Sequence, residues 1–126
     1  MAFKNILLID DDEDDQEIFL TAAQSGLPHV NCSALEDATI ALKKLKSREL
    51  TPDAIFLDLN MPVMNGVQFM TEIKKLPTLS DIPIIIFSTS SNAKTIQQLM
   101  DLGAHDFVTK PASFDELVDI LKRLLN

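Results

Sequence analysis

The chain has 126 residues, enough for one domain with a hydrophobic core and too few for two, so we expect a single domain over residues 1–126. Apolar residues make up 46% and charged residues 24%, and a net charge of −8 disfavours direct binding to nucleic acid, whose phosphates it would repel. The single cysteine excludes an internal disulfide and indicates the cytoplasm, and no apolar run is long enough to span a membrane.

Five short apolar segments alternate with five amphipathic patterns along the chain. The apolar segments are typical of buried strands and cover residues 3–9, 30–34, 54–57, 82–87 and 104–108. Each is followed by apolar residues three or four apart, which is the spacing of the buried face of a helix. The helical positions are Ile18, Phe19, Ala22 and Ala23; Ala38, Ala41, Leu42 and Leu45; Val67, Phe69, Met70 and Ile73; Ile96, Leu99 and Met100; and Leu117, Ile120, Leu121 and Leu124.

Strands that alternate with helices predict an α/β fold, with a parallel sheet covered on both faces. The segments around Ile6, Ile55 and Ile84 are the most apolar, which favours the centre of the sheet. Those around Val30 and Phe107 are weaker and belong at its edges. With right-handed crossovers, these positions favour the strand order 2-1-3-4-5. The predicted architecture is therefore a doubly wound, flavodoxin-like (βα)5 sandwich of three layers.

Acidic side chains follow the first and third predicted strands directly. Asp10 and Asp11 come after the first strand, and Asp58 comes after the third. The predicted order places these two strands side by side, at the switch point where open α/β sheets bind their ligands. Because three clustered carboxylates repel one another, we expect a hard divalent cation with oxygen ligands to offset the repulsion. Mg²⁺ suits such an open site, since it keeps several of its waters.

Two further polar side chains are predicted to face the same crevice. Ser88 ends the fourth strand and Lys110 ends the fifth. A carboxylate, a metal ion, a hydroxyl and a cation together are suited to phosphoryl transfer, because the cations neutralise charge on the transferred group. In that reaction Asp58 is the nucleophile and becomes an aspartyl phosphate. The acidic residues 12–15 are interpreted instead as the solvated start of a helix.

Four motifs at these strand ends resemble those of one protein family. They are Ile9-Asp10-Asp11-Asp12, Asp58-Leu-Asn-Met-Pro-Val-Met-Asn-Gly66, Phe87-Ser88-Thr89 and Lys110-Pro111. On these motifs, and over its whole length, the sequence resembles the receiver domain of the response regulators of two-component signalling. The resemblance implies that a histidine kinase or a phosphotransfer protein phosphorylates Asp58 in the presence of Mg²⁺.

The resemblance also implies roles for the neighbouring residues. Asp11 and Asp58 would bind the metal ion directly, Asp10 would bind it through water, and Asn60 would contribute its backbone carbonyl. The Lys110–Pro111 peptide is commonly cis in this family. No separate substrate is turned over, so the protein is expected to be a phosphoacceptor that phosphorylates and dephosphorylates itself, not an enzyme.

Signal output is expected to depend on a coupled movement of two side chains. Phosphate on Asp58 would draw Ser88 toward it, and Phe107 would fill the space that Ser88 leaves. The face made by the fourth helix, fifth strand and fifth helix would change and bind a downstream protein, unless the domain passes its phosphate on in a phosphorelay. Asn60 and Ser90 would flank the path of the hydrolytic water and set the lifetime of the phosphate.

Three other functions fit the sequence less well. A haloacid-dehalogenase-type phosphatase needs a second acid two residues after its nucleophile, and Asn60 occupies that place. A flavodoxin needs a hydroxyl- and glycine-rich loop after the first strand, and an acidic loop would repel the FMN phosphate. A pseudo-receiver, which binds proteins without being phosphorylated, would lack part of the site, and here every position is filled. The sequence leaves the cognate kinase, the downstream target and the oligomeric state open. It also leaves open whether the domain binds a target, relays its phosphate or drains phosphate from a shared pathway.

Overall fold

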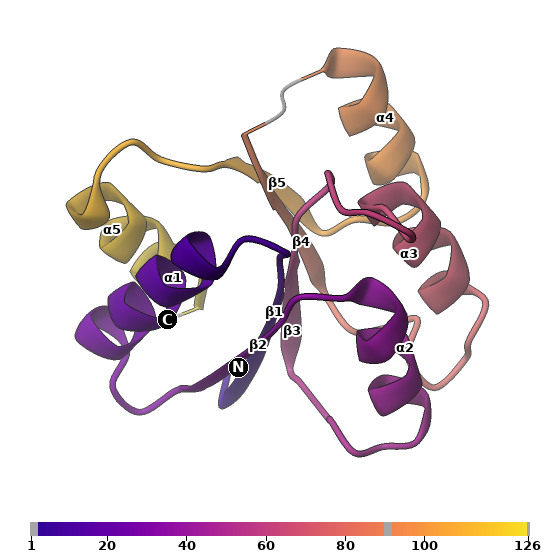
Figure 1. The fold of residues 1–126 in the computed structure, drawn as a ribbon, viewed down its shortest axis with the longest axis horizontal. Helices are drawn as coiled ribbons and strands as arrows, with labels where there is room; N and C mark the ends of the chain where they lie inside the picture. Colours follow the sequence, from indigo (N-terminus) through magenta and orange to yellow (C-terminus); the bar gives the residue numbers. More distant parts are fainter. Residues whose placement is uncertain (1–2, 90–91, 126) are drawn as a thin grey trace.

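The computed structural model describes residues 3–89 and 92–125, and within them five strands alternate with five helices (Figure 1). The strands are β1 (Asn5–Ile9), β2 (Asn31–Leu35), β3 (Ala54–Leu57), β4 (Ile84–Ser88) and β5 (Asp106–Thr109). The helices are α1 (Glu13–Gly26), α2 (Ala38–Lys46), α3 (Gly66–Lys74), α4 (Ala93–Asp101) and α5 (Phe114–Leu125). The predicted (βα)5 succession is confirmed.

All neighbouring strands are parallel, and their order is β2-β1-β3-β4-β5, as predicted. Helices α1 and α5 cover one face of the sheet, and α2, α3 and α4 cover the other (Figure 1). The last residue of β1, Ile9, is paired with the last residue of β3, Leu57. Because the two strands end in register, Asp10 and Asp58 leave the sheet side by side at its carboxyl edge.

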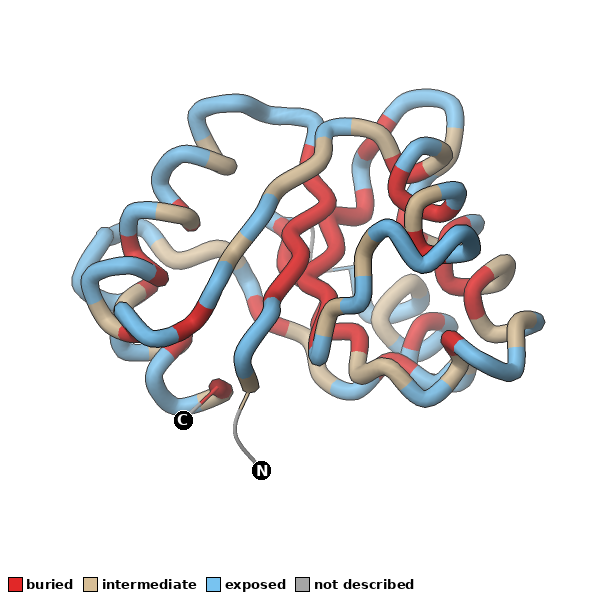
Figure 2. The backbone as a smooth tube through the Cα atoms, turned by 90° about the horizontal axis from the view of Figure 1, so that it is seen from below, coloured by how far each residue is buried: buried red, intermediate tan, exposed pale blue. Residues whose placement is uncertain are grey.

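The central strands are buried on both faces, which explains their nearly continuous apolar sequences (Figure 2). Successive side chains of a strand alternate between the faces, so one strand contributes to two cores. In β1, Ile6 and Leu8 pack in the core under α1 and α5. Leu7 and Ile9 pack in the core under α2, α3 and α4. The strand ends that carry polar residues are therefore held by rigid, doubly covered strands.

Two apolar positions that the helical pattern predicts to be buried are exposed. Ile18 of α1 is 48% exposed and Met100 of α4 is 42% exposed, so neither belongs to the core. The buried stripe of α1 is narrower than predicted and consists of Phe19, Ala22 and Ala23. On α5, Phe114 at the first position is 41% exposed, whereas Leu117, Leu121 and Leu125 are buried.

The loop between β3 and α3 is fixed by close backbone contacts. The N–H of Gly66 donates to the carbonyl of Leu59 at 3.1 Å, and a Cβ atom on Gly66 would lie 2.7 Å from Leu59 Cδ2. A capping box between Asn65 and Gln68 then starts α3. Within the loop, Val63 adopts a φ of 68°, which is costly for a β-branched residue. This closed loop holds the residues that follow Asp58.

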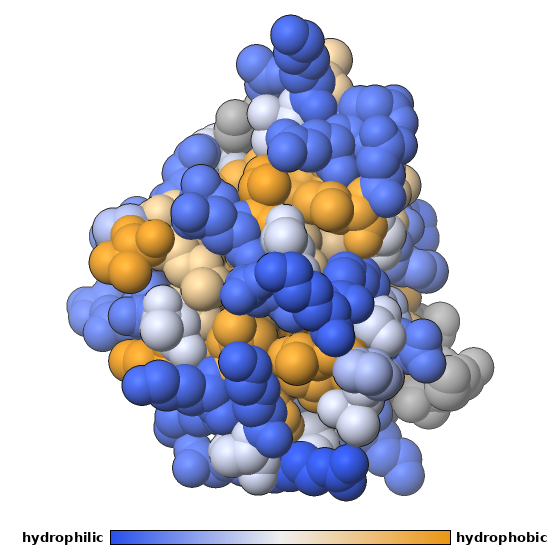
Figure 3. Space-filling model, turned by 90° about the vertical axis from the view of Figure 1, so that its right-hand side faces the viewer, coloured by the Kyte–Doolittle hydropathy of each residue, from blue (hydrophilic) through white to orange (hydrophobic). Residues whose placement is uncertain are grey.

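The surface over α2, α3 and α4 is a mixture of polar residues and separate apolar ones (Figure 3). No helix in the described part of the chain is long and apolar enough to cross a membrane. The Lys110–Pro111 peptide is trans, as are all peptide bonds among the described residues, so the cis geometry that the resemblance implied is wrong for this structure.

Candidate functional site

Three carboxylates meet at the carboxyl edge of the sheet. Asp10 is fully buried and Asp58 is 7% exposed, while Asp11 faces solvent. The backbone N–H of Asp58 donates to the carbonyl of Ile9 at 3.0 Å, which ties the two strand ends together. One oxygen atom from each of Asp10, Asp11 and Asp58 lies within 4.8 Å of the others. The structure thus brings together the three acids that the sequence singled out.

The ammonium of Lys110 lies among these acids. Its Nζ is 2.8 Å from Asp10 Oδ2 and 3.8 Å from Asp58 Oδ2, and its side chain is only 12% exposed. Lys110 follows β5, and its backbone N–H donates to the carbonyl of Ser88 at 3.0 Å. The β4–β5 pairing therefore sets the position from which the lysine side chain reaches the acids.

Burial and neighbouring charges have opposite effects on the pKa values of Asp10 and Lys110. Burial raises the pKa of Asp10, although hydrogen bonds from Lys110 and from the N–H of Asp12, together with the charge of Lys110, act to lower it. Burial alone would lower the pKa of Lys110, but hydrogen bonds to Asp10 and Asp15 and the charges of Asp10 and Asp58 raise it above its usual value. Lys110 is thus firmly protonated, and the ionised form of Asp10 depends on it.

Asp15 is part of the site although nothing in the sequence distinguishes it from its acidic neighbours. Its Oδ2 lies 2.8 Å from Lys110 Nζ, and its side chain is 37% exposed. The neighbouring Asp12 caps α1, since its side chain accepts a hydrogen bond from the N–H of Asp15 at 3.0 Å. The interpretation of residues 12–15 as the solvated start of a helix is therefore wrong for Asp15. The first turn of α1 directs this one acid into the crevice.

Four predicted site residues remain, and the structure describes three of them. Ser88 is fully buried at the end of β4. Phe107 is half-buried on β5, opposite Ile86, and packs against the core under α2, α3 and α4. Asn60 is exposed, two residues after Asp58. Ser90 lies outside the described residues.

The cluster has the chemistry of a site for a hard divalent cation. Asp58 Oδ1 accepts a hydrogen bond from the N–H of Leu59 at 2.8 Å, and Asp10 Oδ1 accepts one from the N–H of Asp12 at 3.0 Å. These contacts orient the carboxylates and leave lone pairs on their oxygens, because each carboxylate offers about four acceptor positions. Oxygen ligands from two buried carboxylates and one exposed carboxylate fit Mg²⁺, which prefers oxygen and retains water on its open side.

The comparisons with known proteins identify one family. A family model described as the response regulator receiver domain matches residues 6–122. Over 122 residues the chain is 31% identical to the two-component response regulator ORR8 of Oryza sativa subsp. indica, which covers 97% of this chain and 98% of ORR8. It is 37% identical over 112 residues to the transcriptional regulatory protein KdpE of Staphylococcus aureus, covering 89% of this chain and 46% of KdpE.

Solved structures show the same architecture. The phosphorylated cyanobacterial phytochrome response regulator RcpA aligns with a TM-score of 0.88 and 31% identity, over 98% of this chain and 91% of RcpA. The Mn²⁺-bound form of response regulator Rcp1 aligns with a TM-score of 0.85 and 25% identity, over 96% of this chain and 91% of Rcp1.

The fold and its acidic crevice define a receiver domain, and the chain belongs to the response regulator receiver domain family. Receiver domains of this family interact with histidine kinases or phosphotransfer proteins. The chain spans about half the length of KdpE and of other curated transcriptional regulators that it matches, but nearly the whole length of ORR8.

Proposed function

We propose that Asp58 accepts a phosphoryl group from a histidine kinase or a phosphotransfer protein, as part of two-component signalling in the cytoplasm. The observation that carries the proposal is the position of Asp58. It is a nearly buried carboxylate at the end of a central strand, within reach of two other acids and 3.8 Å from the Nζ of Lys110. Such a group is held rigidly by the end of the strand and keeps a small exposed fraction, which suits a positioned nucleophile.

In the proposed reaction one oxygen of Asp58 attacks the phosphorus of a phosphohistidine. A P–O bond forms to Asp58 while the P–N bond breaks, and the electron pair of that bond leaves with the imidazole. The N–H of Leu59 holds the Asp58 carboxylate in orientation through Oδ1. The ammonium of Lys110 exchanges its ion pair with Asp15 for one with an oxygen of the transferred group. Negative charge accumulates on that oxygen during the transfer.

The proposed metal ligands are Asp10, Asp11, Asp58 and the backbone carbonyl of Asn60, with Mg²⁺ as the ion. When bound, the cation would neutralise the negative charge that the acids and the phosphoryl oxygens bring together. The relative Rcp1 has been solved in an Mn²⁺-bound form, which supports a divalent ion in this chain.

The proposal is tested by exposing the protein to a small phosphodonor such as acetyl phosphate, with and without Mg²⁺. The intact mass should rise by one phosphoryl group when both are present, and the rise should be lost when EDTA removes the metal. A protein that stays unmodified at millimolar donor and Mg²⁺ would be a pseudo-receiver, and the proposed function would then be wrong.

Mg²⁺ should raise the melting temperature of the protein, because the unfolded chain lacks the assembled acids. Asp11→Asn should raise the melting temperature of the metal-free protein by removing repulsion, and should reduce the shift that Mg²⁺ produces. Asp14→Asn is the matched control, since Asp14 is also exposed near the start of α1. Thermal melts in Mg²⁺ and in EDTA measure both effects. If the Mg²⁺-induced shift in melting temperature were the same for Asp11→Asn and Asp14→Asn, Asp11 would not be a metal ligand.

We propose that Ser88 and Phe107 couple phosphorylation to the surface formed by α4, β5 and α5, where a downstream protein would bind. A phosphoryl analogue such as beryllofluoride should change amide chemical shifts from Asn92 to Phe114 in wild type. Ser88→Ala should keep phosphorylation but reduce these changes, because its hydroxyl can no longer bond to the phosphoryl group. Changes confined to the loops beside Asp11 and Asp58 in wild type would exclude this coupling.

We propose that Asn60 and Ser90 set the lifetime of the phosphate. Asn60 is exposed beside the acceptor and can hydrogen-bond the attacking water, so the expected lifetime is intermediate. Asn60→Lys should slow the loss of phosphate several-fold by obstructing the water, while uptake from acetyl phosphate stays measurable. Phosphate release after removal of the donor measures the rate. If substitutions of Asn60 and of Ser90 both left the rate of phosphate loss equal to that of wild type, other residues would control the access of water.

A further inference from the structure

Strand β2 forms one edge of the sheet and lacks the features that usually protect an edge strand. Its sequence, Asn31-Cys-Ser-Ala-Leu35, contains no charge, no proline and no glycine. The opposite edge strand, β5, begins at Asp106 and is followed directly by Lys110 and Pro111. Because charge and proline discourage the addition of another strand, β2 is the more receptive edge.

The backbone groups of β2 divide between β1 and the open edge. The N–H of Asn31 and the carbonyl of Leu35 both bond to the β1 segment, at 2.8 and 3.0 Å. Since successive residues of a strand point in alternate directions, Ser33 also directs its backbone groups to β1. Cys32 and Ala34 direct theirs outward. The edge therefore presents two N–H donors and two carbonyl acceptors, two residues apart.

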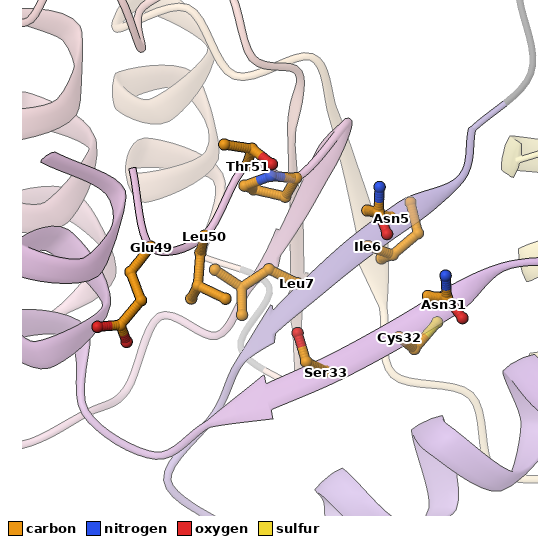
Figure 4. Close-up of a pocket in the computed structure, with 10 residues that line it drawn as sticks. Asn5, Ile6, Leu7, Asn31, Cys32, Ser33, Glu49, Leu50 and Thr51 are labelled. Carbon is orange, nitrogen blue, oxygen red and sulfur yellow. The ribbon is translucent and has the colours of Figure 1, made fainter. Parts of the chain in front are cut away.

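A hollow lies beside β2 on each face of the sheet. On the side of α2, a hollow of about 240 Å³ is bordered by Ser33, Leu7 and Leu50 (Figure 4). On the side of α1, a hollow of about 300 Å³ is bordered by Leu20 and Val30. An added strand sends alternate side chains to opposite faces, and on each face one of these hollows borders residues of β2.

We propose that β2 pairs antiparallel with β2 of a second copy of this chain, across a two-fold axis at Ser33. In this register Cys32 lies opposite Ala34 of the other copy, and the two residues exchange N–H···O bonds in both directions. All four outward backbone groups of each β2 strand are then satisfied. The contact is self-complementary and closes as a dimer, in which the two sheets become one.

The two acids that follow β2 favour the antiparallel arrangement. Glu36 and Asp37 follow the strand, and His29 lies just before it. A parallel pair would bring the acids of both copies together, whereas the antiparallel pair places them next to the His29 end of the other copy. Both copies still carry a net charge of −8, so their overall repulsion should weaken as salt screens it. Association should therefore increase with ionic strength.

Two variants with opposite charges at position 33 test the proposal. Ser33 is exposed and would lie opposite Ser33 of the second copy at the two-fold axis. Sedimentation equilibrium of the wild-type protein should show an average mass that rises toward twice the monomer mass with concentration. Ser33→Lys and Ser33→Asp should each remain monomeric under the same conditions, since each places like charges face to face. An equimolar mixture of the two variants should dimerise again, which shows that both remain folded.

A disulfide gives a second readout. Residues at the axis would form a non-hydrogen-bonded pair with a Cα separation of about 4.5 Å, which suits a disulfide. Ser33→Cys in a Cys32→Ser background should therefore give covalent dimers under mild oxidation, and Ser47→Cys in the same background, also exposed, should not.

The inference is overturned if the wild-type protein stays monomeric at every concentration, if both charged variants dimerise as well as wild type, or if their mixture stays monomeric. It is also overturned if the edge of β2 binds an extended peptide from another protein and never a second copy.

Discussion

Asp58→Asn should abolish phosphoryl uptake from acetyl phosphate, so that the intact mass remains that of the unmodified chain. An amide has nearly the shape of a carboxylate but is a very poor nucleophile, so the variant removes the chemistry and keeps the packing. Asp81→Asn is the control, because Asp81 is an exposed acid in the segment before β4. It should gain one phosphoryl group as the wild type does. Mass spectrometry after a fixed incubation measures both.

The fold of Asp58→Asn is expected to be intact, so a loss of phosphoryl uptake would reflect the missing nucleophile and not unfolding. The substitution removes one of three neighbouring carboxylates and so reduces repulsion in the metal-free protein. Its melting temperature should therefore be equal to that of wild type or higher. If the variant still gained a phosphoryl group, the acceptor would be another residue, and Asp10 and Asp11 would be the first to examine.

The sequence alone predicted the arrangement of the strands and most of the crevice. In a parallel sheet all carboxyl ends lie at one edge, so residues that directly follow the strands must converge there. Asp10, Asp58 and Lys110 are of this kind. The structure places Lys110 Nζ 2.8 Å from Asp10 and 3.8 Å from Asp58, and it places oxygens of the two acids within 4.8 Å of each other. Strand order followed from the contrast between continuous apolar runs and weaker ones.

The wrong predictions for α1 concern residues whose positions depend on how the helix is rotated about its axis. Asp15 lies two residues inside α1, and the rotation of that helix decides which of its acidic residues faces Lys110. The same rotation leaves Ile18 exposed, because helical spacing predicts a buried stripe but not its width. The geometry of the Lys110–Pro111 peptide was equally beyond the sequence, since cis and trans forms of such bonds differ by only about 1 kcal/mol.

Lys110→Met should destabilise the metal-free protein strongly. The substitution keeps a flexible, unbranched side chain one atom shorter than that of lysine, and it removes the charge that lies 2.8 Å from Asp10, whose side chain is fully buried. Breaking a buried ion pair in this way costs about 3 kcal/mol, because the remaining charge has no partner. Lys122→Met, at an exposed position of α5, is the control and should change stability little. Urea unfolding in EDTA measures the free energy of unfolding of each.

The double variant Asp10→Asn/Lys110→Met should recover much of that loss. It removes both charges together, and replacing both partners of a buried pair is far less costly than removing one. Burial already raises the pKa of Asp10, which shows that its charge is costly in this position and that Lys110 is what offsets the cost. Asp10→Asn alone should therefore be neutral or stabilising in EDTA, because Lys110 keeps Asp15 as a partner. Additive effects in this double-mutant cycle would mean that the ion pair contributes nothing to the stability of the site.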